Sequence, residues 1–201
     1  KKMAVKIQDQ VLVHFVQGSS TWMARQERVF VGMLKGYGGK REGKQSLLDC
    51  LVDEIQKETG VLREYCRYHE TEPGIKVLPE HLHLKGLAYI TEVDDTNEVG
   101  KIIRLWCYHS SIYKGVPVAT VEMDDPQLYP INNLPFTQMV PGDDLLIPLI
   151  FLETFFKASF TRRSFDKGML RETFEFNLLE KNDLYVLAAD ADKEVLEIPA
   201  Q

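Results

Sequence analysis

Apolar and polar positions along the chain follow two periods, one typical of strands and one typical of a helix. Residues 11–16 form the first β-rich run, and residues 22–26 and 29–34 are two further strand candidates after a turn at 18–20. Between residues 47 and 58 the apolar positions recur three and four residues apart, which predicts an amphipathic helix. The first elements are therefore expected to be three strands followed by a helix.

Capping residues mark both ends of the predicted helix. Ser46 is a good N-cap, and Asp49 three residues later resembles a capping box with Asp in place of Glu. Gly60 supplies a C-terminal stop. Glu54 and Glu58 are four residues apart, so their carboxylates are expected one above the other beside the apolar face.

The middle of the chain alternates between long β-rich runs and loops. Residues 81–93 and 102–113 are rich in apolar and β-branched side chains and are joined by a polar segment, which predicts an antiparallel pair of strands. Residues 117–142 are rich in proline and acidic side chains. We interpret this segment as a loop region.

The last third of the chain predicts a short helix and two strands. Asp143 or Asp144 caps a helix that ends near residue 152, and strands follow near residues 157–161 and 170–178. A turn at Asp166-Lys-Gly168 joins these strands. The tail from residue 180 alternates acidic and apolar residues, and its pattern assigns it to no element.

Composition restricts the class of protein. The net charge of −6 argues against binding to nucleic-acid polymers, so recognition of phosphate must be local or carried by bound cations. Three widely spaced cysteines form no disulfide framework and suit a reducing compartment. The sequence has neither an apolar run of about 18 residues, which a membrane span needs, nor a signal peptide. We expect a cytoplasmic protein without a membrane partner.

Residues 35–44 contain four glycines and four cations. Glycine lets a backbone approach a ligand closely, and lysine and arginine neutralise phosphate, so the segment is a candidate phosphate-binding loop. An ordinary flexible surface turn explains the glycines equally well.

Residues 39–61 resemble the Nudix box, whose pattern is G-x5-E-x7-R-E-U-x-E-E-x-G-U, where U is a bulky aliphatic residue. When the last glycine is placed on Gly60, the first falls on Gly39 and two catalytic-helix glutamates fall on Glu54 and Glu58. Three charged positions of the box are altered: Gln45 replaces its first Glu, Asp53 its Arg, and Lys57 the first Glu of its E-E pair.

Later segments resemble the mammalian 8-oxo-dGTP diphosphatase branch of the same family. The matching pieces are, in order, residues 115–123, Leu134-Pro-Phe136, residues 139–144 and Pro148. The resemblance covers roughly residues 11–176. It implies the Nudix fold, an α/β (α+β) fold with a mixed β-sheet sandwiched between helices, as a single domain over residues 1–201, with a core at about 11–178 and a C-terminal extension at 179–201.

The resemblance also implies a metal-dependent hydrolase. Mg²⁺ or Mn²⁺ requires oxygen ligands, and cleavage of a diphosphate needs cations to neutralise its charge. Glu54, Glu58, Glu122 and the Gly39 carbonyl are the implied ligands, and Glu122 matches a further carboxylate of the family that either binds metal or positions the attacking water. The alternative for each glutamate is an ordinary solvated surface acid.

Candidate substrate contacts follow from the same resemblance. Asp143 and Asp144 match approximately a pair of aspartates that hydrogen-bond a purine edge, although helix capping is the alternative. Tyr37 is the candidate for stacking on a base, and Lys40 is the candidate phosphate contact. An oxidised purine nucleotide stays among the candidate substrates, although Val140 stands where the family has a tryptophan, which weakens that assignment.

The altered box positions have a physical consequence. Asp53 and Lys57 are four residues apart, so we expect them to form an ion pair worth a few tenths of a kcal/mol, about 0.2–0.5. Because Lys57 replaces an acid, the metal-facing negative charge is reduced, and we expect fewer or weaker metal sites than in a standard box, or none.

Two functions remain open at this stage. The first is hydrolysis of a nucleoside triphosphate or another nucleoside diphosphate derivative. The second is a binding or sensor module that retains a nucleotide or phosphometabolite pocket without turnover. A homodimer is an expectation that rests on the family resemblance alone.

Overall fold

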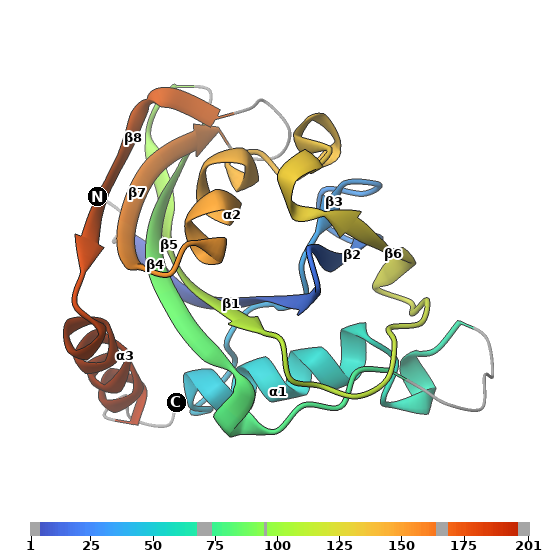
Figure 1. Cartoon of the computed structure of the whole chain (residues 1–201). Helices are drawn as coiled ribbons and strands as arrows, with labels where there is room; N and C mark the ends of the chain where they lie inside the picture. Colours follow the sequence, from blue (N-terminus) through green and yellow to red (C-terminus); the bar gives the residue numbers. More distant parts are fainter. Residues whose placement is uncertain (1–4, 68–73, 95, 164–168, 197–201) are drawn as a thin grey trace.

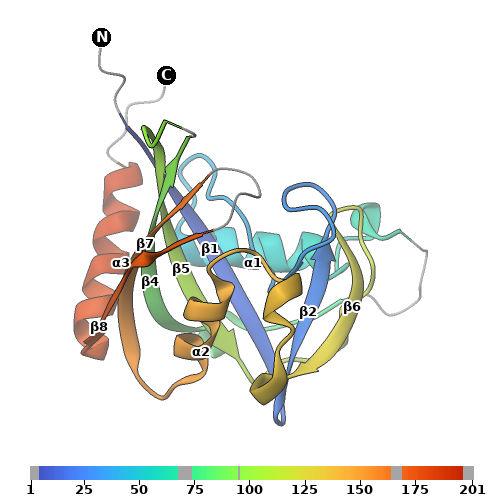
Figure 2. The same ribbon diagram turned by 90° about the horizontal axis from the view of Figure 1, so that it is seen from above.

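The computed structural model describes residues 5–67, 74–94, 96–163 and 169–196. A curved mixed sheet forms the centre of the molecule, with helices on both of its faces (Figure 1, Figure 2). The order of the strands is β3-β2-β1-β5-β4-β7-β8, and β6 pairs with β2 outside this path. This arrangement confirms the α/β (α+β) class with a mixed sheet between helices.

The elements have the following bounds in the described ranges. The strands are β1 (Lys6–Gln17), β2 (Ser20–Gln26), β3 (Leu34–Lys35), β4 (His83–Val93), β5 (Val99–Ser110), β6 (Met123–Pro130), β7 (Phe155–Arg163) and β8 (Met169–Leu179). The helices are α1 (Leu47–Glu58), α2 (Asp143–Phe151) and α3 (Lys181–Leu196), with short 3-10 helices at Arg63–Tyr65, Pro79–His81, Ile131–Asn133 and Phe136–Gln138. Of the helices seen in these ranges, none has the length and apolar character that crossing a bilayer requires.

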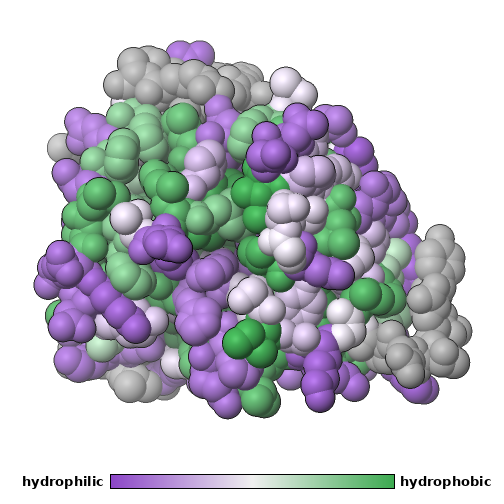
Figure 3. Space-filling view, viewed as in Figure 1, coloured by the Kyte–Doolittle hydropathy of each residue, from purple (hydrophilic) through white to green (hydrophobic). Residues whose placement is uncertain are grey.

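Strands pair in both directions across the sheet. β1 is antiparallel to β2 and parallel to β5, while β4 is antiparallel to β5 and parallel to β7. The predicted antiparallel pair at 81–93 and 102–113 is therefore confirmed as β4 and β5. β8 pairs with β7 and ends the strand order. Hydrophobic surface gathers over β7, β8 and α2 on the face shown in Figure 3. Phe176 and Leu178 of β8 are among the exposed large hydrophobic residues.

Alternating side chains of β1 divide the core between the two faces of the sheet. Val11, Val13 and Phe15 pack with residues of α1 and α3, whereas Leu12 packs with residues of α2. Figure 2 shows α2 on the opposite side of the sheet from α1 and α3. The sheet is therefore covered on both faces, and the cavity described below lies on the α2 side.

Helix α1 has the predicted bounds. The Ser46 hydroxyl accepts a hydrogen bond from the Asp49 N–H at 3.0 Å, as the capping motif requires. Thr59 caps the C-terminus and Gly60 follows with a φ of 87°, a left-handed conformation that favours glycine. Local sequence thus determines both ends of this helix.

Two predictions of local structure are wrong. Residues 29–34 were expected to form a strand, but Phe30 and Gly32 have positive φ values of 54° and 79°, which a strand does not permit. Only Leu34 and Lys35 enter the sheet, as β3. Residues 117–142 contain strand β6, and its Pro126 lies where the register with β2 shifts, so the missing N–H breaks no regular ladder.

The C-terminal part differs from the prediction at two points. Gly142, with a φ of 102°, is the N-cap of α2, so neither aspartate caps this helix. The unassigned tail forms α3, whose Leu184 and Ala191 are buried against the body of the protein. Strands β7 and β8 confirm the two predicted strands. The predicted turn at 166–168 lies outside the described residues.

A buried ion cluster joins β1, β5 and the segment that precedes α1. The Asp9 carboxylate accepts hydrogen bonds from Arg104 at 2.8 and 2.9 Å, from the Trp106 indole at 3.0 Å and from Arg41 at 3.3 Å. Arg41 also donates to Asp192 of α3 at 2.6 Å. One buried carboxylate therefore balances two arginines and links three separate parts of the chain.

Replacing Asp9 is expected to destabilise the protein strongly. In Asp9→Ala two arginines lose their buried partner, so the free energy of unfolding should fall by about 3–5 kcal/mol. Urea denaturation followed by circular dichroism would measure the change. The matched control is Asp190→Ala, which removes an exposed pair with Lys193 and should change stability by less than about 1 kcal/mol. Equal losses in the two variants would contradict the role given to Asp9.

Candidate functional site

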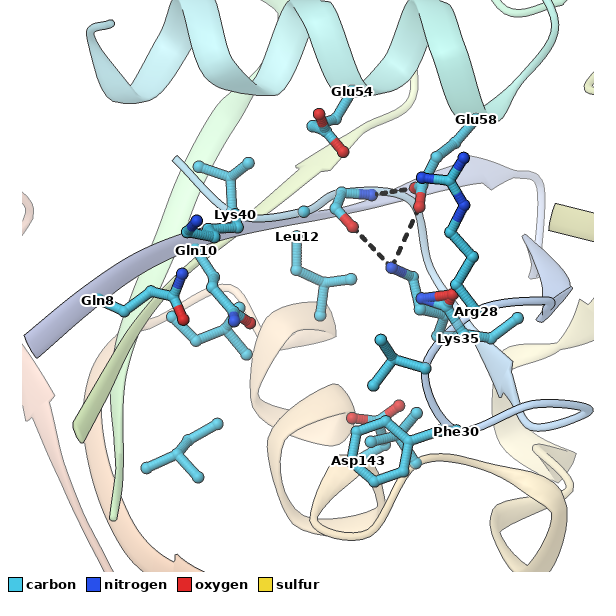
Figure 4. Close-up of a pocket in the computed structure, with 18 of the residues that line it drawn as sticks. Gln8, Gln10, Leu12, Arg28, Phe30, Lys35, Lys40, Glu54, Glu58 and Asp143 are labelled. Atoms are coloured by element: carbon cyan, nitrogen blue, oxygen red, sulfur yellow. Dashed lines mark hydrogen bonds and ion pairs between the residues drawn. The ribbon is translucent and has the colours of Figure 1, made fainter. Parts of the chain in front are cut away.

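A cavity of about 580 Å³ lies between the α2 side of the sheet and the segment that precedes α1 (Figure 4). Strands β1, β4, β5 and β7, helices α1 and α2 and the β2–β3 loop all contribute to its lining. Its volume is in the range of small-molecule sites. Acidic and cationic side chains line it in equal number, and the acids are Glu42, Glu54, Glu58, Glu92, Glu122 and Asp143.

Glu58, at the end of α1, is buried and fully hydrogen-bonded. The Gly38 N–H donates to its Oε2 at 2.5 Å, and Lys35 lies 3.3 Å from its Oε1. Lys35 also donates to the Gly38 carbonyl at 2.6 Å, as the dashed lines in Figure 4 show. Burial raises the pKa of Glu58 to about 7, although Lys35 and the Gly38 N–H lower it. The carboxylate can therefore exchange a proton near neutral pH.

Glu54 lies one turn earlier on α1, against the glycine segment. Its carboxylate lies so close to Gly39 that a Cβ at this position would displace it. The other carboxylate oxygen accepts from Lys57 at 2.9 Å, and this hydrogen bond raises the pKa of Lys57. The predicted Asp53–Lys57 pair is therefore wrong.

Asp53 instead contacts another altered position of the box. Its carboxylate accepts a hydrogen bond from the Gln45 side chain at 2.5 Å. Gln45 and Asp53 thus satisfy each other outside the cavity lining, while Lys57 is free to turn toward Glu54. The three altered positions therefore form two separate contacts, one between Gln45 and Asp53 and one between Lys57 and Glu54.

Glu122 enters the cavity from the segment before β6. Its carboxylate forms an ion pair with Arg28 at 2.8 Å, and its exposed fraction is 17%. The Thr120 hydroxyl accepts from the Glu122 N–H at 3.2 Å and fixes the local turn. The structure thus brings a distant acid to the same cavity as the acids of α1.

Each of these three carboxylates has its own protein cation. The pairs are Glu54–Lys57, Glu58–Lys35 and Glu122–Arg28. Carboxylate and carbonyl oxygens are the donors that Mg²⁺ and Mn²⁺ prefer, so the donor set fits such an ion by type. A bound ion would have to compete with these cations. In the described part of the chain, no group of three or more His, Cys, Asp or Glu side chains is already arranged around a metal position.

Asp143, the first residue of α2, is a buried acid at the cavity wall. Among the residues that the structure describes, its Oδ2 has no hydrogen-bond partner, and burial raises the pKa of the carboxyl to about 7, although Arg162 and Lys35 lower it. Asp144, the second predicted contact, does not line the cavity. Lys40 lines the cavity with a side chain that is 51% exposed, paired with Glu42 at 3.7 Å.

The assignment of Tyr37 as a stacking residue is wrong. Its side chain is fully buried in the core on the α1 side of the sheet, with its ring 6.0 Å from that of Phe15. It does not line the cavity and presents no face to a ligand. Residue Gly39 does line the cavity, although its carbonyl accepts a hydrogen bond from the Val11 N–H at 2.9 Å.

Several lining residues were missed at the level of sequence. Phe30 belongs to the segment 29–34 that was expected to be a strand and instead has its ring centroid 5.1 Å from the Arg162 guanidinium, while Arg28 lies between the two expected strands. In the sheet order three strands lie between β2 and β7 and four between β3 and β7, so only the folded chain brings these residues together. The missed residues that line the cavity include Gln8, Gln10, Arg28, Phe30, Lys35, Glu92, Lys101 and Arg162.

Comparisons with known proteins identify the fold. No protein-family model matches the chain, and no curated protein matches it. Among solved structures, a MutT mutator protein from Bacillus halodurans has a TM-score of 0.65 and 17% sequence identity, over 85% of this chain and 97% of that one. A NUDIX hydrolase from Nitrosomonas europaea has a TM-score of 0.52 and 9% identity, over 79% and 81%.

A third solved structure agrees with these two. The E. coli ORF135 protein has a TM-score of 0.51 and 19% identity, over 73% of this chain and 87% of that one. At such identities the similarity concerns the fold. The chain has the Nudix fold, as the resemblance of its box implied.

The buried carboxyl of Asp143 predicts a specific dependence of stability on pH. Because its pKa is higher in the folded protein than in the unfolded chain, its contribution to stability is lost as pH rises toward 7. Asp143→Asn should therefore gain stability relative to the wild type by roughly 3 kcal/mol between pH 5 and pH 8. Urea unfolding at both pH values would measure this.

A matched control distinguishes burial from a general effect of charge. Asp190→Asn removes an exposed acid of α3, and its stability relative to the wild type should be similar at pH 5 and pH 8. A difference between wild type and Asp143→Asn that does not change with pH would contradict the buried, proton-binding state of this carboxyl.

Proposed function

We propose that this chain hydrolyses a nucleoside triphosphate or another nucleoside diphosphate derivative in the cavity, with a divalent cation held more weakly than a standard Nudix box would hold it. The observation that carries the proposal is the meeting of Glu54, Glu58 and Glu122 with the backbone of Gly38 and Gly39 in one cavity. The Nudix fold and the similarity to a NUDIX hydrolase and a MutT mutator protein support the reaction class.

The residues that would hold Mg²⁺ or Mn²⁺ are Glu54, Glu58, Glu122 and the Gly39 carbonyl. When bound, such an ion would neutralise the charge of the phosphates and activate water. The exposed side chains of Lys40 and Arg28 line the same cavity, with Arg28 paired to Glu122, and are suited to binding phosphate oxygens.

Proton transfer is assigned to Glu58. With no cation bound, its pKa of about 7 lies close to neutral pH, where a carboxylate can accept and release a proton, and a divalent ion bound to it would lower this pKa. Lys35 and the Gly38 N–H hold both oxygens of this carboxylate, so its orientation is fixed by the glycine segment. Water that reacts at the phosphate is expected to lose its proton to this group.

The ion pairs within the site explain why metal affinity should be low. Lys57 is about one-third exposed, and a pair of this kind is worth no more than about 1 kcal/mol, so an ion can displace it from Glu54. Lys35 is less exposed, and its pair with Glu58 is harder to open. Binding of a metal is therefore opposed by the protein's own cations.

The same ion pairs favour a second candidate, a binding module without turnover. Each of the three carboxylates already has a cation partner, and the cavity could hold a phosphorylated ligand on its remaining cations. The two functions share the ligand class and differ in whether the phosphate chain is broken. Product analysis decides between them.

Hydrolysis should depend on the acids of α1. A panel of dGTP, 8-oxo-dGTP, ADP-ribose and dinucleoside polyphosphates, incubated with Mg²⁺ and then with Mn²⁺, is expected to give phosphate products from at least one compound. Glu54→Gln and Glu58→Gln should each lower that turnover by about 100- to 10,000-fold. Chromatography of the products measures the reaction.

The matched control is Glu64→Gln, an exposed acid outside the cavity, which should leave turnover unchanged. Binding of a nucleotide without cleavage of any compound would replace the hydrolase with the binding module. Unchanged turnover in Glu58→Gln would remove this residue from the reaction.

Restoring an acid at Lys57 should strengthen metal binding. Lys57→Glu changes the charge beside Glu54 by two units and removes the competing cation, so the apparent Kd for Mn²⁺ should fall by at least about 10-fold, with higher turnover. Calorimetric titration with Mn²⁺ measures the affinity. Lys44→Glu makes the same charge change at an exposed position outside the cavity, and equal effects of the two variants would contradict a local role for Lys57.

A further inference from the structure

One wall of the cavity is polar where the rest of this sheet face is apolar. Lys101 of β5, Glu92 of β4 and Arg162 of β7 are direct cross-strand neighbours. Two residues along each strand, the same face carries Ile103, Ile90 and Phe160, which belong to the core beneath α2. The sheet therefore changes from hydrophobic to charged within the cavity lining.

Glu92 holds the two cations of this row in place. Arg162 donates to its Oε1 at 3.0 and 2.6 Å, and Lys101 lies 2.9 Å from its Oε2. Burial alone would raise the pKa of Glu92, but the contacts with Lys101 and Arg162 outweigh it and the pKa is lowered. The row consequently presents an ionised acceptor between two cationic donors.

Two amides of β1 lie on the same face next to this row, with Gln8 opposite Ile103 and Gln10 opposite Leu105 of β5. Gln8 and Gln10 lie two residues apart on the strand, half-buried, and both line the cavity. Neither side chain has a hydrogen bond to another residue in the part of the chain that the structure describes. Figure 4 shows them beside Lys40 and apart from the acids of α1. We call Gln8, Gln10, Glu92, Lys101 and Arg162 the polar wall.

The polar wall is a poor surface for the face of a purine base. A flat aromatic face that covered Gln8 and Gln10 would remove water from two amides that have no hydrogen bond to another described residue, without offering hydrogen bonds in return. The cost of leaving such groups unpaired in a site is what makes polar pockets selective. A ligand group that fits must offer several donors and acceptors at once.

Hydroxyl groups meet this requirement, because each both donates and accepts. Amide and cationic groups of the wall can donate to hydroxyl oxygens, while Glu92 and the amide carbonyls can accept from hydroxyl protons. We propose that the polar wall selects a sugar or polyol group of the diphosphate ligand over a flat purine base. This inference rests on the proposed function only in requiring that the cavity take a diphosphate compound.

The experiment compares ligands that differ by one sugar. Isothermal titration calorimetry with Mg²⁺ measures UDP-glucose against UDP and ADP-ribose against ADP, with chromatography of the cell contents to detect cleavage. In the wild type the added sugar should tighten binding by at least about 10-fold in one of the pairs. We call the ratio of the two Kd values in a pair, without and with the sugar, the gain from the sugar, and the polar wall is expected to determine it.

Variants of the wall should reduce that gain selectively. Gln8→Leu combined with Gln10→Leu should lower it by about 2- to 10-fold per lost hydrogen bond, while the affinities for UDP and ADP stay the same. Gln17→Leu is the matched control, since Gln17 is an exposed glutamine of the same strand outside the cavity. Lys101→Gln is a second probe if the double variant does not fold, and it should reduce the gain in the same way.

The outcomes separate the inference from the proposed function. If the sugar increases affinity by less than about 2-fold in both pairs, or if the increase is unchanged in the variants, the polar wall does not select a sugar. Binding of the diphosphates would still support the proposed function in either case. Tighter binding of 8-oxo-dGTP than of UDP-glucose and ADP-ribose would also overturn the inference. If no diphosphate binds at all, the proposed function fails first and the inference fails with it.

Discussion

The geometry of the cavity depends on how closely the segment before α1 lies against β1. Four backbone hydrogen bonds join them, from Val11 to Gly39, between Val13 and Tyr37 in both directions, and from Arg41 to Asp9. Gly38, with a φ of 140°, allows this approach, because a Cβ there would overlap the Val11 carbonyl. The same segment offers its Gly38 N–H to Glu58, so main-chain pairing places the acids of α1 at the cavity.

Electrostatic balance is the second feature that sets the chemistry. A cavity with equal numbers of acids and cations has little net attraction for a divalent ion, yet it contains many hydrogen-bonding groups. Burial further shifts Glu58 and Asp143 toward their neutral forms, because a charged carboxylate is poorly solvated there. Selectivity in this site therefore depends on the matching of donors and acceptors more than on total charge.

Sequence patterns predicted the parts of the fold that local physics determines. Helix α1 was predicted from its apolar spacing and from Ser46 and Gly60, and strands β4 and β5 from their composition. The turn at Phe30 was missed, because a positive φ at phenylalanine depends on surrounding contacts and not on local preference. Strand β6 was missed since proline argues against a strand unless it falls at a register shift.

The site was predicted less completely than the fold. The resemblance to the Nudix box pointed to Glu54 and Glu58, but their cation partners could be assigned only from the folded chain, since Lys57 was equally able to reach Asp53. Tyr37 was misassigned because adjacent residues of an extended segment point to opposite sides. Residues of the polar wall come from four strands, and no local pattern joins them.

Helix α3 ties distant parts of the sequence to the beginning of α1. The Asp192 carboxylate accepts from the Leu47 N–H at 2.9 Å, which satisfies one of the free N–H groups of the first turn, and from Arg41 at 2.6 Å. Its partners lie roughly 150 positions earlier, and loops of that length close late because of their entropy. During synthesis on the ribosome, the segment before α1 can therefore contact both β1 and α3 only after α3 has been synthesised.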